Sequence, residues 1–228
     1  VGLLFVANVG FCQTTFPVNG VYEKDNPTYA FIGATIYQDH NNIIHNGVML
    51  VKNGLIQDIG QNIKVPKAAV QVDLNGLYIY PSFIDAYTEY GQPEIKHLKM
   101  VHGPKIESGK HGAFSWNEAI HPEISSAMSF RYNKKQSEEL RKLGFGAVLS
   151  VPNDGIVMGS SAFVLLGNGK ENELILKSDA AATYSFSKGK SRQDYPSSLM
   201  GSIALLRQSY LDAEWYSSNT NKDEINLS

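Results

Sequence analysis

The stretch Leu77-Tyr78-Ile79-Tyr80-Pro81-Ser82-Phe83-Ile84-Asp85-Ala86-Tyr87-Thr88-Glu89-Tyr90-Gly91 decides the fold of this chain. It is rich in β-branched and aromatic residues, and it predicts a strand buried on both faces, as in parallel sheets. Because alternate side chains of a strand share a face, Asp85, Tyr87 and Glu89 are expected on one face. Three oxygen-bearing side chains at the end of a buried strand indicate a functional site.

The segment at residues 75–89 resembles the first barrel strand of the metal-dependent amidohydrolase superfamily, whose pattern is Pro-Gly-Phe-Ile-Asp-x-His-x-His. Four positions of that pattern are kept, namely Pro81, Phe83, Ile84 and Asp85. Ser82 replaces the glycine, and Tyr87 and Glu89 replace the two histidines, which bind the catalytic metal in that family. The resemblance, to imidazolonepropionase-like and large secreted bacterial amidohydrolases, implies that Tyr87 and Glu89 occupy the metal-ligand positions.

Before this stretch, residues 30–76 have the pattern of a small all-β domain. Short apolar runs predict four strands, at residues 30–37, 48–52, 55–60 and 70–74. Asn-Gly pairs supply the positive φ of a two-residue hairpin turn, so Asn53-Gly54 is expected to join antiparallel neighbours in a small sheet or sandwich. Residues 47–60 also resemble the composite β domain that precedes the barrel in amidohydrolases.

After the stretch, the chain has the helix and strand order of an α/β barrel or doubly wound sheet. The expected elements are an irregular loop at residues 91–132, a helix at 137–144, a strand at 147–151, a strand and turn at 159–170 and a helix at 199–216. Ser137 is expected to cap the first helix and Gly144 to close it. The second helix has one apolar face, comprising Leu199, Ile203, Leu206 and Tyr210.

The expected fold class is therefore α/β, with a small composite β-sandwich domain at residues 30–76 and the first part of a (β/α)8 TIM-like barrel at residues 77–228. A complete barrel needs about 250 residues, so we expect the sequence to stop inside this domain. Residues 13–29 are interpreted as a linker.

Residues 1–12 are apolar and have the length of a signal-peptide core, which is too short to span a bilayer. Gly10 and Cys12 provide small residues for cleavage before Gln13. This predicts a secreted or periplasmic protein, and a buried N-terminal strand is the alternative. Cys12 is the only cysteine, so no disulfide or thiol site is expected after cleavage. A net charge of −2 without a basic run argues against nucleic acid as a partner.

The resemblance implies hydrolysis of a carbon–nitrogen bond by water that a divalent metal, zinc or a similar ion, activates. Among the replaced positions Glu89 is an ordinary metal ligand, whereas the phenol of Tyr87 is a poor substitute for imidazole. The alternative interpretation is that Tyr87 and Glu89 form hydrogen bonds at the barrel mouth and hold no metal. Asp85 is interpreted as support for the turn after the strand.

Other candidate groups have a structural interpretation that we favour. The four histidines of the expected loop show no His-x-His spacing and are expected to be exposed; they are His97, His102, His111 and His121. The basic cluster of Lys188, Lys190 and Arg192 is expected to be solvated, with anion binding as the less favoured reading.

Three hypotheses for function follow. The chain is part of a secreted amidohydrolase acting on a non-peptide or cyclic amide, with the remaining site residues elsewhere. Alternatively, it is a degenerate, non-catalytic domain that binds a ligand or pairs with an active domain. The third is an unrelated exported α/β binding module. The expected partners are a small amide-type substrate and either a second copy of the chain or a following catalytic domain.

Overall fold

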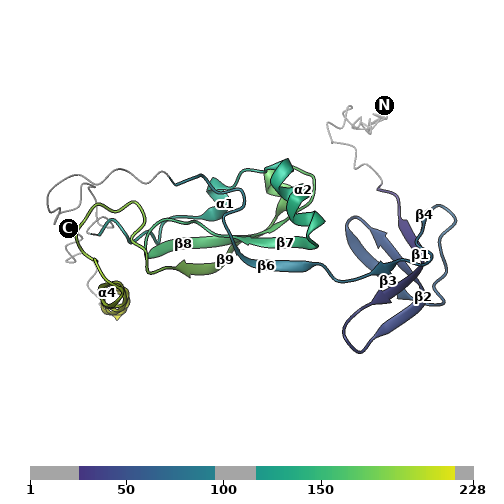
Figure 1. Cartoon of the computed structure of the whole chain (residues 1–228), viewed down its shortest axis with the longest axis horizontal. Helices are drawn as coiled ribbons and strands as arrows, with labels where there is room; N and C mark the ends of the chain where they lie inside the picture. Colours follow the sequence, from purple (N-terminus) through teal and green to yellow (C-terminus); the bar gives the residue numbers. More distant parts are fainter. Residues whose placement is uncertain (1–25, 96–116, 219–228) are drawn as a thin grey trace, which may run out of the picture. The chain divides into compact units, whose positions relative to one another are not determined.

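The computed structural model describes residues 26–95 and 117–218 (Figure 1), so the signal-peptide expectation lies outside the described residues. The chain divides into two compact units, Val1–Pro81 and Ser82–Ser228. The sequence pattern places this boundary between Gly76 and Leu77. It lies later because strand β5 (Tyr78–Ile79) pairs in parallel with strand β1 (Tyr29–Tyr37) of the first unit.

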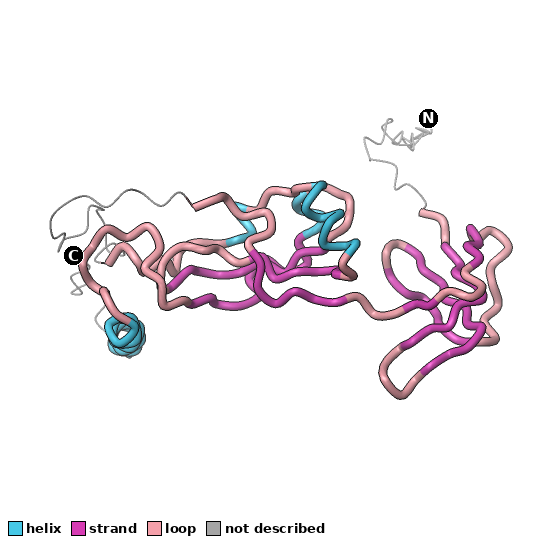
Figure 2. Tube along the Cα trace, in the orientation of Figure 1, coloured by secondary structure: helices cyan, strands magenta, loops and turns pink. Residues whose placement is uncertain are grey.

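The described part of the first unit is one five-stranded sheet, shown in Figure 2 as strands joined by loops. Besides β5, its strands are β1 (Tyr29–Tyr37), β2 (Ile43–Lys52), β3 (Leu55–Gly60) and β4 (Val70–Asp73). β1 is antiparallel to β2 and parallel to β4 and β5. The four expected strands are therefore confirmed, with β2 beginning earlier than predicted. The unit is consistent with a β-sandwich-like domain.

Asn-Gly pairs have two different roles in this sheet. Asn53 and Gly54 have φ values of 54° and 75° and join β2 to β3 in an antiparallel hairpin, as predicted. Asn46 also has a positive φ, of 49°, but it lies inside β2. Gly47, next to it, pairs with Ala34 where the β1–β2 register shifts. The second Asn-Gly pair therefore accompanies a bulge, which is a common use of positive φ in strands.

The described part of the second unit contains a four-stranded sheet in the order β6-β7-β8-β9. Its elements are β6 (Phe83–Thr88), α1 (Ser126–Ser129), α2 (Lys134–Lys142), β7 (Phe145–Ser150), β8 (Val157–Leu165), α3 (Glu171–Leu174), β9 (Ile175–Tyr184) and α4 (Leu199–Ser218). β6 and β7 are parallel, whereas β7–β8 and β8–β9 are antiparallel. The chain is thus mixed α/β as expected, but a (β/α)8 barrel is not confirmed, because the short link from β7 to β8 leaves no room for a crossover helix.

Strand β6 is less buried than the sequence predicts. It is the end strand of its sheet, and Phe83 and Ile84 are 65% and 60% exposed. The prediction of a strand buried on both faces is therefore wrong for the described residues, whereas its parallel pairing is confirmed. The apolar side chains of β6 are suited to burial, but no described element covers them.

Helix α2 begins before the predicted start because another residue caps it. The Asn133 side chain accepts a hydrogen bond from the Gln136 backbone N–H at 3.1 Å, as an N-cap does. Ser137 is buried inside the helix, and its hydroxyl donates to the Leu166 carbonyl at 2.9 Å. The predicted cap at Ser137 is therefore wrong. Gly144, with a φ of 93°, follows the helix end as predicted.

Helix α4 confirms the predicted helix, but a different face is buried. Ser202 and Leu205 are the buried residues of α4. Leu205 belongs to a core cluster with Ala119, Ile120 and Ile156. Three members of the predicted apolar face are exposed, namely Leu199, Ile203 and Tyr210. In the described ranges no helix is long and apolar enough to cross a membrane.

Residues 117–132 were expected to belong to an irregular loop, but they pack as part of the core. Ile120 and Ser125 form bridges with Val157 and Ser160 of β8, and α1 packs on the same strand. Figure 1 shows α1 and α2 on one side of the β6–β9 sheet. The rest of the expected loop, residues 96–116, lies outside the described residues.

Candidate functional site

The carboxyl ends of β6 and β7 meet at one edge of their sheet. Just after β7, the Val151 backbone N–H donates to the carbonyl of Thr88, the last residue of β6, at 2.8 Å, which keeps the two chain segments together. In open α/β sheets ligands bind outside the carboxyl ends of parallel strands. The residues that directly follow β6 and β7 are therefore the candidate functional site.

The two residues predicted to bind metal both lie at the end of β6, and the structure holds them differently. Oε1 of Glu89 accepts a hydrogen bond from the side-chain amide of Asn153, which follows β7. Tyr87 is 54% exposed, and its backbone N–H donates to Oδ1 of Asp85 at 3.0 Å. Asp85 thus supports the backbone at this end of the strand, in agreement with its structural interpretation.

A partly buried side-chain amide connects the loop after β6 to β7 and α1. Nε2 of Gln92 donates to the Ser150 hydroxyl at 2.7 Å and to the Ser126 carbonyl at 3.2 Å. Oε1 of Gln92 accepts from the Ser129 hydroxyl at 2.6 Å. The Ser150 hydroxyl in turn donates to the Tyr90 carbonyl at 2.7 Å. Because both ends of the Gln92 amide are bonded, the network fixes the segment that follows Glu89.

One position in this network is open. The Ser126 hydroxyl is buried and has no hydrogen-bond partner among the described residues. Buried polar atoms are nearly always paired, because an unpaired one costs about 1–3 kcal/mol. The hydroxyl is thus available as a donor or an acceptor at the carboxyl end of the sheet.

Tyr90 and Gly91 form a tight turn below the candidate site. The Tyr90 ring is fully buried and packs on Phe130 with centroids 5.6 Å apart. Burial raises the pKa of Tyr90, so its hydroxyl stays neutral. Gly91 has a φ of 74°, and a Cβ there would overlap the Phe130 ring and lie 2.8 Å from the Arg131 carbonyl oxygen. Only glycine fits this turn without a shift of its neighbours.

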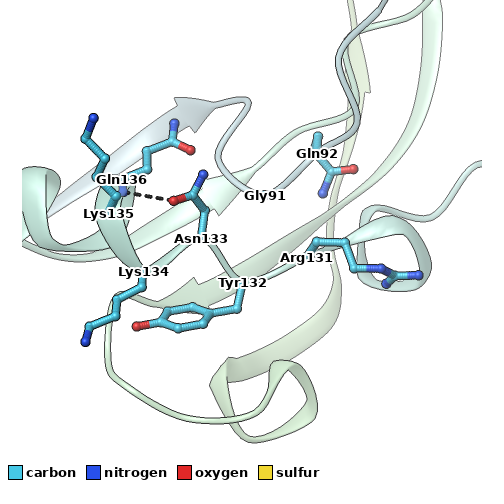
Figure 3. Close-up of a pocket in the computed structure, with 8 residues that line it drawn as sticks. All are labelled: Gly91, Gln92, Arg131, Tyr132, Asn133, Lys134, Lys135 and Gln136. Atoms are coloured by element: carbon cyan, nitrogen blue, oxygen red, sulfur yellow. Dashed lines mark hydrogen bonds between the residues drawn. The ribbon is translucent and has the colours of Figure 1, made fainter.

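A hollow of about 460 Å³ lies beside this turn and is shown in Figure 3. It is lined by Gly91, Gln92, Arg131, Tyr132, Asn133, Lys134, Lys135 and Gln136. In Figure 3 the side chains of Arg131, Lys134 and Lys135 extend in different directions. The Arg131 guanidinium donates to the Phe130 carbonyl at 2.7 Å, and Lys134 lies 3.9 Å from Glu138. The three cations therefore do not converge on one anion.

Of the four histidines, only His121 falls within the described residues. It was expected to be exposed, but it is 5% exposed, and its Nδ1 lies 3.4 Å from Oε1 of Glu123. The reason is that residues 117–132 pack on β8. His97, His102 and His111 lie outside the described residues. In residues 26–95 and 117–218, no three His, Cys, Asp or Glu side chains are grouped to hold a metal ion.

The two lysines of the basic cluster contact the protein's own acceptors. Nζ of Lys188 donates to the Gln193 carbonyl at 2.7 Å, and Nζ of Lys190 lies 3.5 Å from Oδ2 of Asp154. The Arg192 backbone N–H donates to Oε2 of Glu118 at 3.1 Å. These contacts give no support to the anion-binding reading.

Sequence reasoning missed three residues of the candidate site: Gln92, Ser150 and Asn153. Each lies at or just beyond the carboxyl end of β6 or β7. The pattern that could have identified them is a polar residue at the end of each of two consecutive parallel strands. Their partners are 58 and 64 positions apart in sequence, for Gln92–Ser150 and Glu89–Asn153 respectively.

No protein-family model matches the chain, and no curated protein does. Among solved structures, the chain is similar to an amidohydrolase from Thermotoga maritima MSB8, with a TM-score of 0.57 and 25% sequence identity. The match covers 87% of this chain and 53% of that one. A second amidohydrolase structure matches 26% of this chain and 14% of its own, at 23% identity and a TM-score of 0.24, which is too low to support an argument.

The first of these likenesses supports the amidohydrolase superfamily as the class to which the fold is similar. The chain spans about half the length of that enzyme. The likeness concerns the fold.

Proposed function

We propose that this chain is part of an exported amidohydrolase-like protein that hydrolyses a carbon–nitrogen bond in a non-peptide or cyclic amide. The main support is the similarity to the Thermotoga maritima amidohydrolase over 87% of the chain. The parallel pair β6–β7, with polar residues beyond its carboxyl ends, provides the location at which ligands bind in such sheets. Export is proposed from the apolar composition of residues 1–12.

In this class of enzyme a divalent metal such as zinc supplies an activated water as the nucleophile. The described residues do not fit a complete metal site. Glu89 contributes one carboxylate, which Asn153 already engages, and Tyr87 contributes a phenol. Catalytic zinc sites use three protein ligands, and no such group is present among the described residues. Further ligands would have to come from outside the described ranges, and Tyr87 and Glu89 remain proposed ligand positions.

The second candidate function is a non-catalytic amidohydrolase-like domain that binds a ligand or pairs with a partner. The hydrogen bond between Glu89 and Asn153 favours it, because it gives the carboxylate a structural role without a metal. The exposed apolar residues of β6 are the part of the chain that a second copy or a catalytic domain would cover.

The natural full-length protein provides the test. Its metal content would be measured by elemental analysis, and hydrolysis of hydantoin and dihydrouracil would be followed with added zinc. Glu89→Gln removes the proposed ligand charge with little change in shape, and Glu139→Gln, at an exposed position of α2, is the matched control.

The proposed activity requires that the unmodified protein hydrolyses a substrate and contains bound metal. Both the hydrolysis rate and the metal content should fall at least about tenfold in Glu89→Gln and stay unchanged in Glu139→Gln. A protein with neither metal nor hydrolysis would contradict the catalytic proposal and support the non-catalytic one. Activity with a metal content that Glu89→Gln leaves unchanged would remove Glu89 from the site.

A further inference from the structure

One face of α4 carries a mainly apolar stripe, of which Ile203, Tyr210 and Leu211 are exposed while Leu206 is partly buried. Its members are Ile203, Leu206, Arg207, Tyr210 and Leu211, which follow the i, i+3, i+4, i+7, i+8 spacing of one helix face. The opposite side of the helix buries Ser202 and Leu205. The helix thus buries a serine while it exposes larger apolar residues, the reverse of the usual arrangement on a protein surface.

This stripe forms the wall of a hollow. With Phe186, from the segment after β9, the five stripe residues line a space of about 510 Å³. Small-molecule sites have volumes of about 300–1,000 Å³ and mostly apolar walls with a few polar groups. The size and composition of the hollow therefore suit a small ligand with an apolar body.

The polar groups at this hollow are hydrogen-bond donors. Arg207 is the only charged residue that lines it, and its guanidinium has no ion pair or hydrogen bond within the described part of the chain. The hydroxyls of Tyr210 and Tyr184 are 2.6 Å apart. One proton is shared between these two oxygens, so the second hydroxyl proton remains available to an outside acceptor.

The Tyr184 hydroxyl keeps its proton at neutral pH. The hydrogen bond with Tyr210, with a smaller contribution from burial, raises the pKa of Tyr184 above the ordinary value for tyrosine. The polar groups among the lining residues are the Arg207 guanidinium and the Tyr210 hydroxyl, and no carboxylate is among the lining residues. A cation and a hydroxyl donor are complementary to an anionic group of a ligand, which accepts hydrogen bonds.

We propose that the hollow on α4 binds a small organic anion with an apolar body, whose carboxylate pairs with Arg207 and whose body lies on Ile203 and Phe186. The site shares no residue with the candidate site at β6 and β7, so it is independent of the proposed hydrolysis. An anionic membrane surface fits less well, because Asp212 and Glu214 on the same helix outnumber Arg207.

The test compares two ligands that differ in charge. Phenylbutyrate and phenylbutanol, which share the aromatic body, would be titrated into the full chain by isothermal titration calorimetry. We expect phenylbutyrate to bind with a Kd below about 1 mM and phenylbutanol to bind at least about tenfold more weakly. Arg207→Gln should weaken phenylbutyrate binding by about tenfold and leave phenylbutanol binding unchanged.

Arg141→Gln is the matched control, because Arg141 is an arginine on α2 that does not line the hollow. The proposal is overturned if phenylbutyrate does not bind, if the two ligands bind equally, or if Arg207→Gln and Arg141→Gln have the same effect. If a variant does not fold, the site is tested instead by NMR chemical-shift changes that phenylbutyrate causes in the unmodified chain. Perturbations by phenylbutyrate should centre on Phe186 and α4, and perturbations centred elsewhere contradict the site.

Discussion

Gly91→Ala should destabilise the second unit more than Gly144→Ala, although both glycines have a positive φ. A residue with a Cβ pays about 1–2 kcal/mol to adopt the left-handed conformation that Gly91 has at a φ of 74°. Its Cβ would also overlap the Phe130 ring and lie 2.8 Å from the Arg131 carbonyl oxygen, and overpacking of this kind costs about 1–3 kcal/mol. The expected loss in the free energy of unfolding is the sum, about 2–5 kcal/mol.

Gly144→Ala is the matched control within the same unit. Gly144 has a φ of 93°, but its nearest neighbour is the exposed Phe83 ring at 3.3 Å, which is free to move. The control should therefore lose only the backbone part, about 1–2 kcal/mol. Urea unfolding followed by tryptophan fluorescence measures both variants, because both tryptophans, Trp116 and Trp215, lie in the second unit.

The difference between the two variants isolates the steric part of the loss. The losses in the free energy of unfolding caused by Gly91→Ala and Gly144→Ala are compared. If they differ by less than about 0.5 kcal/mol, the close contact between Gly91 and Phe130 is not the reason that this turn requires glycine.

Three further predictions use the same unfolding assay. Ser150→Ala should cost about 1–3 kcal/mol, because it leaves the buried Tyr90 carbonyl without its donor; a neutral result would contradict the Gln92 network. Asn133→Ala should cost about 1 kcal/mol through loss of the α2 cap, and Ser137→Ala about 1–3 kcal/mol through loss of its buried bond to Leu166; a smaller loss for Ser137→Ala would reverse the roles given to the two residues. The raised pKa of Tyr184 makes its pair with Tyr210 stabilising below the pKa of an unfolded tyrosine, about 10, and this contribution is lost as pH rises through the folded pKa. Tyr184→Phe should remove that alkaline dependence, and an unchanged slope would refute the assignment.

Features that depend on neighbouring residues could be predicted from the sequence. The Asn53-Gly54 hairpin follows from turn chemistry, and the Gly144 stop from the conformational freedom of glycine. The periodicity of residues 199–216 predicted helix α4. The parallel partnership of β6 and β7 followed from a helix placed between two apolar strands.

Features that depend on distant contacts could not be predicted. Periodicity shows that α4 has an apolar face, but it does not show whether that face meets the core, and here Leu205 on another face does. The apolar composition of β6 suggested burial, whereas exposure depends on which strands stand beside it. At the candidate site, the partner of Glu89 is Asn153, 64 positions away, and no local pattern connects the two.

The position of β6 in its sheet has a practical consequence for purified samples. Within residues 26–95 and 117–218, no strand pairs with the outer side of β6, and an uncovered strand edge of this kind is a template for aggregation. Asp85 is the single charged residue in Phe83–Thr88, so little electrostatic repulsion opposes such stacking. Concentrated solutions of the isolated chain are expected to form β-rich oligomers, and a lysine introduced at Ala86 should keep them monomeric for longer.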